Sequence, residues 1–188
     1  MDEHVVDDPV LEQRYVFRRI PDHDGGEVLQ VDAWVDPGGG VLLTHVHPEM
    51  EERFEVLAGQ VTFVLGRKRV IAGPGEKATV APGVRHGYHN SGAEPAHLIC
   101  EIRSPLGGQL QAFLEDAAAL DRAGAFTKRG IPTGFTALLK GAVMLYHYSD
   151  MVVFSPFPAL ERRLTAPLAR LGERRGYRAG AFALDADA

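Results

Sequence analysis

The sequence predicts a mainly β protein, in which an antiparallel sandwich or barrel is followed by an α-helical extension. Between residues 14 and 104, short runs of alternating or β-branched residues are separated by Gly, Pro and Asp turns, which is typical of β structure. From residue 105 to residue 188, apolar residues recur instead at helical spacing. Residues 1–13 are acidic and have no clear period. We therefore expect a flexible N-terminal segment (1–13), a β domain (14–104) and a helical extension (105–188).

Nine segments of the β domain carry the strand pattern. They are Tyr15–Ile20, Val28–Val35, Val41–Val46, Arg53–Leu57, Gln60–Leu65, Lys68–Ala72, Lys77–Ala81, Gly87–Asn90 and His97–Arg103. So many short strands at close spacing favour a sandwich or a barrel. Because the histidine pattern described below occurs only once, we expect a single β unit.

Three helices are expected in the extension. The first runs from Gly108 to a C-terminal stop at Gly124, and its apolar stripe consists of Leu110, Phe113, Leu114, Ala117 and Leu120. The second covers residues 136–148. The third is expected to be capped by Ser155, with Pro156 at its first position and a kink near Pro167. We expect these helices to pack on the barrel or on a dimer partner, and the alternative is a lid over the functional site.

Composition argues against two classes of function. The 188-residue chain has a formal net charge of −5 and no long run of one sign, which argues against an electrostatic nucleic-acid binder. The arginine-rich stretch 161–178 is interrupted by Glu161 and Glu173, which indicates a solvated face. The most apolar stretch, 141–160, is broken by His147, Asp150, Pro156 and Pro158, so no membrane span is expected.

The cysteine content and the first residues bear on the compartment. Cys100 is the only cysteine and cannot form an intrachain disulfide, which fits a reducing compartment. The first ten residues are acidic and lack the basic and apolar regions of a signal peptide. We therefore expect a cytoplasmic protein.

The most specific chemistry lies in histidines and a carboxylate on segments that are predicted as strands. Residues two apart in a strand share a face, so His45 and His47 point the same way. In the next strand, Glu52 shares a face with Phe54 and Val56. Because both apolar side chains favour the core, we expect the Glu52 carboxylate to point inward with them.

His86 completes this set at the start of a later strand. A buried carboxylate among apolar neighbours needs a partner, which a divalent cation provides, while neutral imidazoles supply the other bonds. The sequence therefore predicts a metal held by His45, His47, Glu52 and His86. The alternative is that these are ordinary polar strand residues.

The same parity predicts a cavity around the metal. The residues expected to line it are Leu43, Phe54, Val56, Val61 and Phe63. Tyr88 lies two residues beyond His86, and its hydroxyl could donate to a substrate or act as a proton donor. The alternative for Tyr88 is a wall aromatic whose hydroxyl is satisfied elsewhere. Cys100 is expected to be a small buried hydrophobe. The histidines expected to be structural or exposed are His4, His23, His97 and His147.

Two motifs of the β domain resemble those of the cupin superfamily. The segment Gly39-x5-His45-Val46-His47-x4-Glu52-x6-Gly59 is similar to the first cupin motif, and Gly75-x7-Gly83-Val84-Arg85-His86-x3-Asn90 is similar to the second. The second motif usually has a proline two residues before its central glycine. Here Ala81 stands at that position and Pro82 follows, which leaves the glycine-to-histidine spacing intact. The resemblance covers residues 28–103.

This resemblance implies an antiparallel jelly-roll barrel with one divalent transition metal inside, bound by the same four side chains. In cupins these positions bind Fe, Mn, Ni, Zn or Cu, and imidazole and carboxylate ligands suit several of these metals. Cupins also commonly form dimers, so we expect a homodimer. Trp34 would then lie at the dimer interface or under the helices.

Three functions are compatible with a jelly-roll barrel that holds one metal. The favoured one is a dioxygenase-like enzyme that acts on a small organic molecule, aromatic or polyketide-like, with substrate and dioxygen bound at the metal. The second is a redox-neutral isomerase, cyclase or lyase in which the metal acts as a Lewis acid. The third is a non-catalytic, metal-stabilised barrel that binds a ligand or serves as a scaffold. The apolar lining that we expect for the cavity favours the first.

Overall fold

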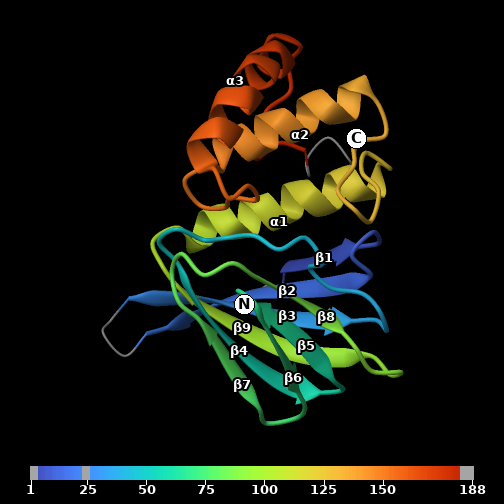
Figure 1. The fold of residues 1–188 in the computed structure, drawn as a ribbon, viewed down its shortest axis with the longest axis vertical. Helices are drawn as coiled ribbons and strands as arrows, with labels where there is room; N and C mark the ends of the chain where they lie inside the picture. The colour runs from blue at the N-terminus through green and yellow to red at the C-terminus, as the bar shows by residue number, and fades with distance from the viewer. Residues whose placement is uncertain (1–3, 23–25, 183–188) are drawn as a thin grey trace.

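The computed structural model describes residues 4–22 and 26–182, in which antiparallel strands form a barrel and the helices are stacked above it (Figure 1). The strands are β1 (His4–Asp8), β2 (Gln13–Pro21), β3 (Glu27–Val35), β4 (Glu51–Ala58), β5 (Val61–Leu65), β6 (Lys68–Ala72), β7 (Lys77–Val80), β8 (His86–Asn90) and β9 (Ala96–Arg103). The helices are α1 (Gly107–Arg122), α2 (Phe135–His147) and α3 (Pro158–Arg174). The mainly β fold with a helical extension is thus confirmed.

Two sheets enclose the barrel interior. The larger has six strands in the order β1-β2-β3-β9-β4-β7, and the smaller has three in the order β6-β5-β8. The strand pairs of both sheets are antiparallel, as a jelly roll requires. Strand alternation fills the interior with apolar side chains. On β9 the buried positions are Ala96, Leu98, Cys100 and Ile102, and the residues between them are half-buried.

The predicted strand Val41–Val46 is wrong, because the structure has an irregular segment between β3 and β4. The backbone changes partner along this segment, which prevents a continuous ladder of hydrogen bonds. His45 pairs with His86, whereas the next residue, Val46, pairs with Val153 beyond α2. The first two histidines of the candidate site therefore lie on a loop that is held from two sides.

The flexible segment expected at residues 1–13 is wrong for residues 4–8. These residues form β1, which pairs with β2 from His4↔Phe17 to Asp8↔Gln13. Val6 and Asp8 are buried on this strand, and α1 contacts it. The sequence did not predict β1, because one of its two buried side chains is a carboxylate, which weakens the apolar alternation typical of a strand.

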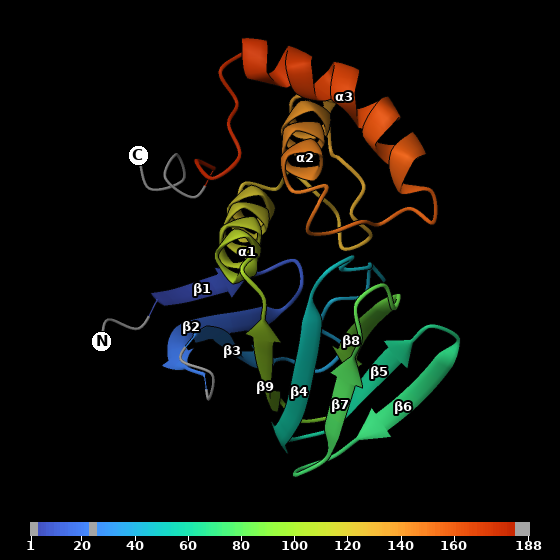
Figure 2. The same ribbon diagram turned by 90° about the vertical axis from the view of Figure 1, so that its left-hand side faces the viewer.

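The helices form successive layers over one end of the barrel. α1 lies on the barrel and contacts β1 and β3, α2 follows, and α3 packs on α2 as the outermost layer (Figure 2). α1 ends two residues before Gly124, whose φ of +67° is the left-handed conformation found after many helices. None of the helices in the described ranges is long and apolar enough to cross a membrane.

The start of α3 differs from the sequence prediction. The helix begins at Pro158 rather than at Pro156, and Phe157 precedes it instead of Ser155. The Ser155 hydroxyl accepts a hydrogen bond from the Phe157 backbone N–H at 3.0 Å, so it stabilises the turn before the helix. α3 continues through Pro167 and is visibly curved in Figure 2.

Candidate metal centre

Three histidines and one glutamate meet where the barrel faces the helices. His45 and His47 come from the irregular segment, Glu52 comes from β4, and His86 is the first residue of β8. One ligand atom of each residue lies within 4.8 Å of those of the other three. His47, Glu52 and His86 are buried, and His45 is half-buried. The structure thus brings together the four residues that the sequence predicted as metal ligands.

Backbone hydrogen bonds fix the two histidine segments against each other. His45 N donates to His86 O and His86 N donates to His45 O, each at 2.9 Å. Gly83 N donates to His47 O at 2.9 Å, and its φ of +79° is a left-handed conformation that favours glycine. A Cβ atom at Gly87 would lie 2.7 Å from the backbone oxygen of Val41. β8 therefore approaches the irregular segment closely at the residue after His86.

Backbone carbonyls orient the three imidazole rings. Each Nδ1 faces one carbonyl oxygen: His45 faces Leu43 at 3.1 Å, His47 faces Met151 at 2.8 Å, and His86 faces Val84 at 2.9 Å. Because a carbonyl only accepts, each Nδ1 carries the hydrogen in the neutral ring and each Nε2 keeps its lone pair. Such contacts are the usual way in which a metal-binding histidine is held in one tautomer.

Two buried atoms of the cluster have no hydrogen-bond partner among the described residues, namely Glu52 Oε2 and His86 Nε2. They lie 2.6 Å apart, and Glu52 Oε1 lies 3.6 Å from His47 Nε2. A carboxylate oxygen and an imidazole lone pair repel each other unless a proton or a cation lies between them, and unpaired buried polar atoms are costly. Three imidazoles and one carboxylate form a donor set that fits a divalent first-row transition metal.

Burial and mutual proximity set the protonation of the ligands. Burial, followed by the neighbouring His86 and His47, lowers the pKa of His45 to about 3. Burial also lowers the pKa of His47. Burial raises the pKa of Glu52, but the adjacent imidazoles outweigh it, so the pKa of Glu52 is lowered. Burial lowers the pKa of His86, but Glu52 outweighs it, so the pKa of His86 is raised.

A segment of the helical extension, residues 151–154, also holds the site. Its Met151 carbonyl faces His47 Nδ1, as described above. Val46 N donates to Val153 O at 2.8 Å, and Val153 N donates to Val46 O at 2.9 Å. Sequence reasoning missed this segment, because it touches the site through backbone atoms and its side chains carry no ligand pattern.

Arg85 joins the same segment to both histidine loops. Its Nη1 donates to Thr44 O at 2.8 Å and to Phe154 O at 2.9 Å. Arg85 precedes the ligand His86 and Thr44 precedes the ligand His45. One guanidinium therefore ties the backbone beside two ligands to the chain that follows α2.

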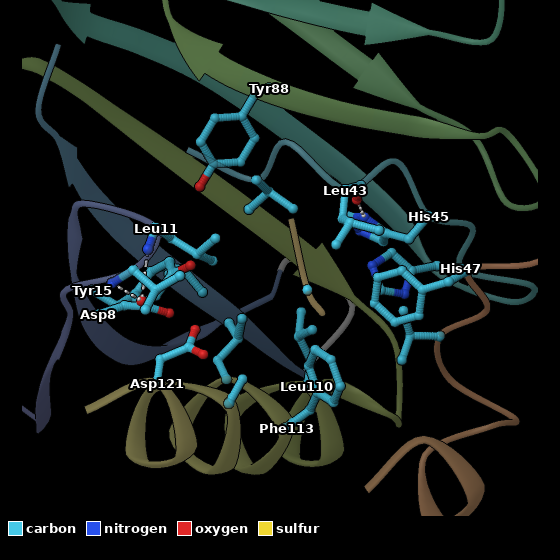
Figure 3. A pocket seen from close by; sticks show the side chains of 18 of the residues that line it. Asp8, Leu11, Tyr15, Leu43, His45, His47, Tyr88, Leu110, Phe113 and Asp121 are labelled. Carbon is cyan, nitrogen blue, oxygen red and sulfur yellow. Dashed lines mark hydrogen bonds between the residues drawn. The ribbon is translucent and has the colours of Figure 1, made fainter. Parts of the chain in front are cut away.

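A cavity of about 270 Å³ extends from the four ligands beneath α1 (Figure 3). Its walls are mostly apolar and come from the barrel, from the irregular segment, and from α1 and α2. Leu110 and Phe113 of α1 contribute to the wall, as does Met144 of α2. The helical extension therefore both packs on the barrel and roofs the cavity.

The residues predicted to line the cavity divide into two groups. Leu43 and Phe54 are part of the cavity wall. Val56, Val61 and Phe63 are buried in the hydrophobic core of the barrel and lie outside the wall. The cavity lies at the end of the barrel that the irregular segment and the helices cover. Strand parity correctly predicted which side chains point inward, but it does not show how far along the barrel the cavity extends.

Tyr88 and Cys100 both face the cavity. The Tyr88 hydroxyl donates to Gln13 Oε1 at 3.0 Å, and burial raises the pKa of this tyrosine. Its ring packs against Phe54 and Phe63, with centroid distances of 5.7 and 6.2 Å. Burial also raises the pKa of the Cys100 thiol well above its usual value, which fits the role of a small buried hydrophobe.

Three further histidines of the described ranges lie away from the cluster. His97 Nε2 lies 2.9 Å from Asp32 Oδ1, and its ring stacks on exposed Trp34 with a centroid distance of 4.3 Å. His4 Nε2 lies 3.0 Å from Glu115 Oε1. His147 packs edge-on against the ring of the residue that follows it. The prediction that His23 is structural or exposed concerns a residue outside the described ranges.

The end of the cavity opposite the histidines holds two carboxyl groups, Asp8 of β1 and Asp121 of α1 (Figure 3). The Asp8 Oδ1 accepts from Val10 N at 3.0 Å and from Leu11 N at 2.9 Å. The Asp121 side chain is hydrogen-bonded to Asp8. Burial, together with the Asp8 carboxyl, raises the pKa of Asp121 to about 7. Sequence reasoning missed this pair because it assigned Asp8 to a flexible segment.

The pair predicts how stability depends on pH. Between the usual aspartate pKa and a pKa near 7, folded Asp121 keeps a proton that the unfolded chain has lost, so stability falls as the pH rises through this window. We expect Asp121→Asn to remove this penalty and to stabilise the protein by about 1–3 kcal/mol at pH 8, with little gain at pH 4. Urea unfolding at both pH values measures the effect. Asp7→Asn, on the same strand, serves as control, and an equal gain for Asp121→Asn at both pH values would contradict the assignment.

Comparison with known proteins agrees with the geometry. Residues 33–101 match the family model of the cupin domain. Residues 33–101 are therefore identified as a cupin domain, as the two motifs predicted, and the helical extension follows these residues. A search of curated protein sequences finds no significant match.

Solved structures of other proteins also resemble part of the chain. TT1209 from Thermus thermophilus is 27% identical, with 46% of this chain and 81% of that chain covered and a TM-score of 0.39. A conserved protein with a double-stranded β-helix domain from Klebsiella pneumoniae is 24% identical, with 52% and 81% covered and a TM-score of 0.43. A sugar phosphate isomerase of the cupin superfamily from Silicibacter pomeroyi is 24% identical, with 51% and 62% covered and a TM-score of 0.43.

Proposed function

We propose that this protein is a metal-dependent, dioxygenase-like enzyme that acts on a small organic molecule inside the barrel. The observation that carries the proposal is the position of the four-residue cluster at one end of a mostly apolar cavity. The two unpartnered atoms, Glu52 Oε2 and His86 Nε2, support a bound cation. The cavity volume of about 270 Å³ is near the lower limit of ligand pockets, which suits a small substrate.

A divalent metal bound by His45, His47, Glu52 and His86 would supply open positions for a substrate and for dioxygen. The chain itself contributes the orientation of the imidazole rings through the three carbonyl contacts at Nδ1. Its apolar wall excludes water and so limits side reactions. An apolar wall also favours an aromatic or polyketide-like substrate over a sugar phosphate.

Oxygen uptake tests this function. The protein is loaded anaerobically with Fe(II), and separately with Mn(II), Ni(II) or Cu(II), and mixed with aromatic diols and 1,3-diketones. We expect dioxygen consumption that matches substrate loss and is absent from Glu52→Ala. Conversion of a substrate without dioxygen uptake would contradict the oxygenase and support a redox-neutral isomerase, cyclase or lyase. Metal-dependent stability without conversion or binding would support a scaffold.

One observation favours the redox-neutral candidate. The Tyr88 hydroxyl lies on the cavity wall and is held by Gln13, where it could deliver a proton to a bound substrate. We expect Tyr88→Phe to leave metal content unchanged and to cost about 0.5–1.5 kcal/mol of stability through the lost hydrogen bond. If Tyr88 moves a proton, the variant turns over at least roughly 100-fold more slowly. An unaltered turnover rate would remove Tyr88 from the mechanism.

A further inference from the structure

The cavity has two chemically different ends. His45 and His47 lie at one end, while Asp8, Tyr15 and Asp121 lie together at the other, with Leu110 and Phe113 along the wall between them (Figure 3). The metal centre accounts for the first end only. The polar groups of the far end therefore need an explanation of their own.

A buried amide links two tyrosines beside this far end. Gln13 Nε2 donates to the Tyr15 hydroxyl, and Gln13 Oε1 accepts from the Tyr88 hydroxyl at 3.0 Å. Gln13 is 5% exposed, Tyr15 is 2% exposed and both tyrosines line the cavity. Tyr15 thus uses its oxygen as an acceptor, and among the described residues no acceptor faces its own O–H hydrogen.

This surplus donor does not depend on the orientation of the amide. If the amide is turned over, Tyr15 donates to Gln13 and Tyr88 accepts from it, so the spare O–H belongs to Tyr88 instead. In either orientation, one buried tyrosyl O–H has no acceptor within the described part of the chain and lies on the cavity wall. A buried donor without a partner is costly, which makes it an independent indication of a ligand.

Two carboxyl groups line the same end of the cavity. Asp8 is 2% exposed, and its Oδ1 is occupied by the backbone N–H groups of Val10 and Leu11. Asp121 contacts Asp8 from α1, and both carboxyl groups line the cavity. The far end therefore offers one O–H donor and carboxyl acceptors, surrounded by apolar side chains.

We propose that this far end is a binding site for a neutral hydroxyl group of the ligand, alcoholic or phenolic, whose other end reaches the metal centre. The inference rests on the proposed function, because it describes the substrate of the same cavity. A hydroxyl accepts from the tyrosyl O–H and donates to the carboxyl pair, so it satisfies both sides of the site.

The same groups reject other chemical classes. An anionic end is repelled by the two carboxyl groups, and Lys128, the cation on the cavity wall, is already paired with Glu12 Oε1 at 2.5 Å. An ammonium group is attracted by the carboxyl groups, but it only donates, so it leaves the tyrosyl O–H without an acceptor. An apolar end leaves the tyrosyl O–H unpaired. The ligand is therefore expected to be a neutral molecule with a hydroxyl group remote from its metal-binding end.

Four probes of similar shape test this inference on the full chain. They are benzyl alcohol, ethylbenzene, benzylamine and phenylacetate, and their binding is followed by NMR through the side-chain carboxyl carbons of Asp8 and Asp121. The titrations use protein freed of metal by a chelator, so the far end is measured separately from the metal centre. We expect benzyl alcohol to bind at least tenfold more tightly than ethylbenzene and phenylacetate, and more tightly than benzylamine, with shifts at both aspartates.

Two variants assign the effect to the named groups. Tyr15→Phe is expected to abolish most of the advantage of benzyl alcohol over ethylbenzene, and Asp121→Asn to abolish the discrimination against phenylacetate. Tyr146→Phe and Asp7→Asn, which lie outside the cavity wall, are the controls and should behave as the wild type. Equal binding of benzyl alcohol and ethylbenzene, tightest binding of phenylacetate, or an unchanged preference in both variants would each overturn the inference. If the proposed metal centre is wrong, the metal content of the protein will show it. These titrations on metal-free protein do not depend on that result.

Discussion

Glu52→Ala is expected to abolish metal binding while leaving the barrel folded. Glu52 is the sole carboxylate of the candidate cluster, and its Oε2 lies 2.6 Å from His86 Nε2. Because the loss of an outer-shell partner alone costs about 10- to 100-fold in metal affinity, the loss of a direct ligand should cost roughly 100-fold or more. Competition titration against a chelator of known affinity measures the change.

The neighbouring residue provides a matched control for this prediction. Glu51 stands on the same strand, points to the opposite face and pairs with Arg53. Glu51→Ala should bind metal as the wild type does, and His47→Ala should lose metal as Glu52→Ala does. An affinity of Glu52→Ala within twofold of the wild type would show that the carboxylate is not a ligand.

Arg85→Met is expected to weaken metal binding by about 10- to 100-fold, although Arg85 is not a ligand. Its guanidinium donates to Thr44 O and to Phe154 O, and so holds the backbone beside His45 and His86 against residues 151–154. Loss of both hydrogen bonds frees this segment, whose Met151 carbonyl orients His47. Arg85→Lys should recover only part of the affinity, because an ammonium lacks the fixed planar geometry in which Nη1 presents its two N–H groups.

The metal affinity of the folded variant separates a positioning role from a structural one. Arg69→Met, on exposed β6, is the control. If Arg85 merely stabilises the fold, Arg85→Met lowers the unfolding temperature of the metal-free protein but binds metal with wild-type affinity. That outcome would contradict the proposed link between the helical extension and the metal centre.

Strand parity and motif spacing predicted the fold class and the ligand set. The sequence predicted His45, His47, Glu52 and His86 from two-residue alternation and motif spacing, which are local properties. The four residues do meet, although His45 and His47 lie on an irregular segment and not on the predicted strand. The apolar alternation on β9 likewise assigned Cys100 to the interior. The position of α1 followed from its apolar stripe at helical spacing.

Long-range backbone contacts could not be predicted in the same way. The Met151 carbonyl reaches His47 from more than one hundred positions further along the chain, and a carbonyl has no sequence signature. Val41–Val46 has the sequence pattern of a strand, but its backbone pairs with His86 at one residue and with Val153 at the next, so no strand forms. Asp8 was hidden because a buried carboxylate resembles a solvent-exposed one until its partner, Asp121, is known.

The metal centre is tested most directly by the metal content of the full chain, expressed without an affinity tag and purified without chelators. Elemental analysis should find close to one divalent transition metal per chain, and stripping followed by titration should restore the same stoichiometry. The metal found would also direct the search for a substrate, since iron, copper, manganese or nickel indicate oxygen chemistry and zinc indicates Lewis-acid chemistry. Protein that contains no metal and takes up none on titration would contradict the metal centre, and with it the proposed enzyme.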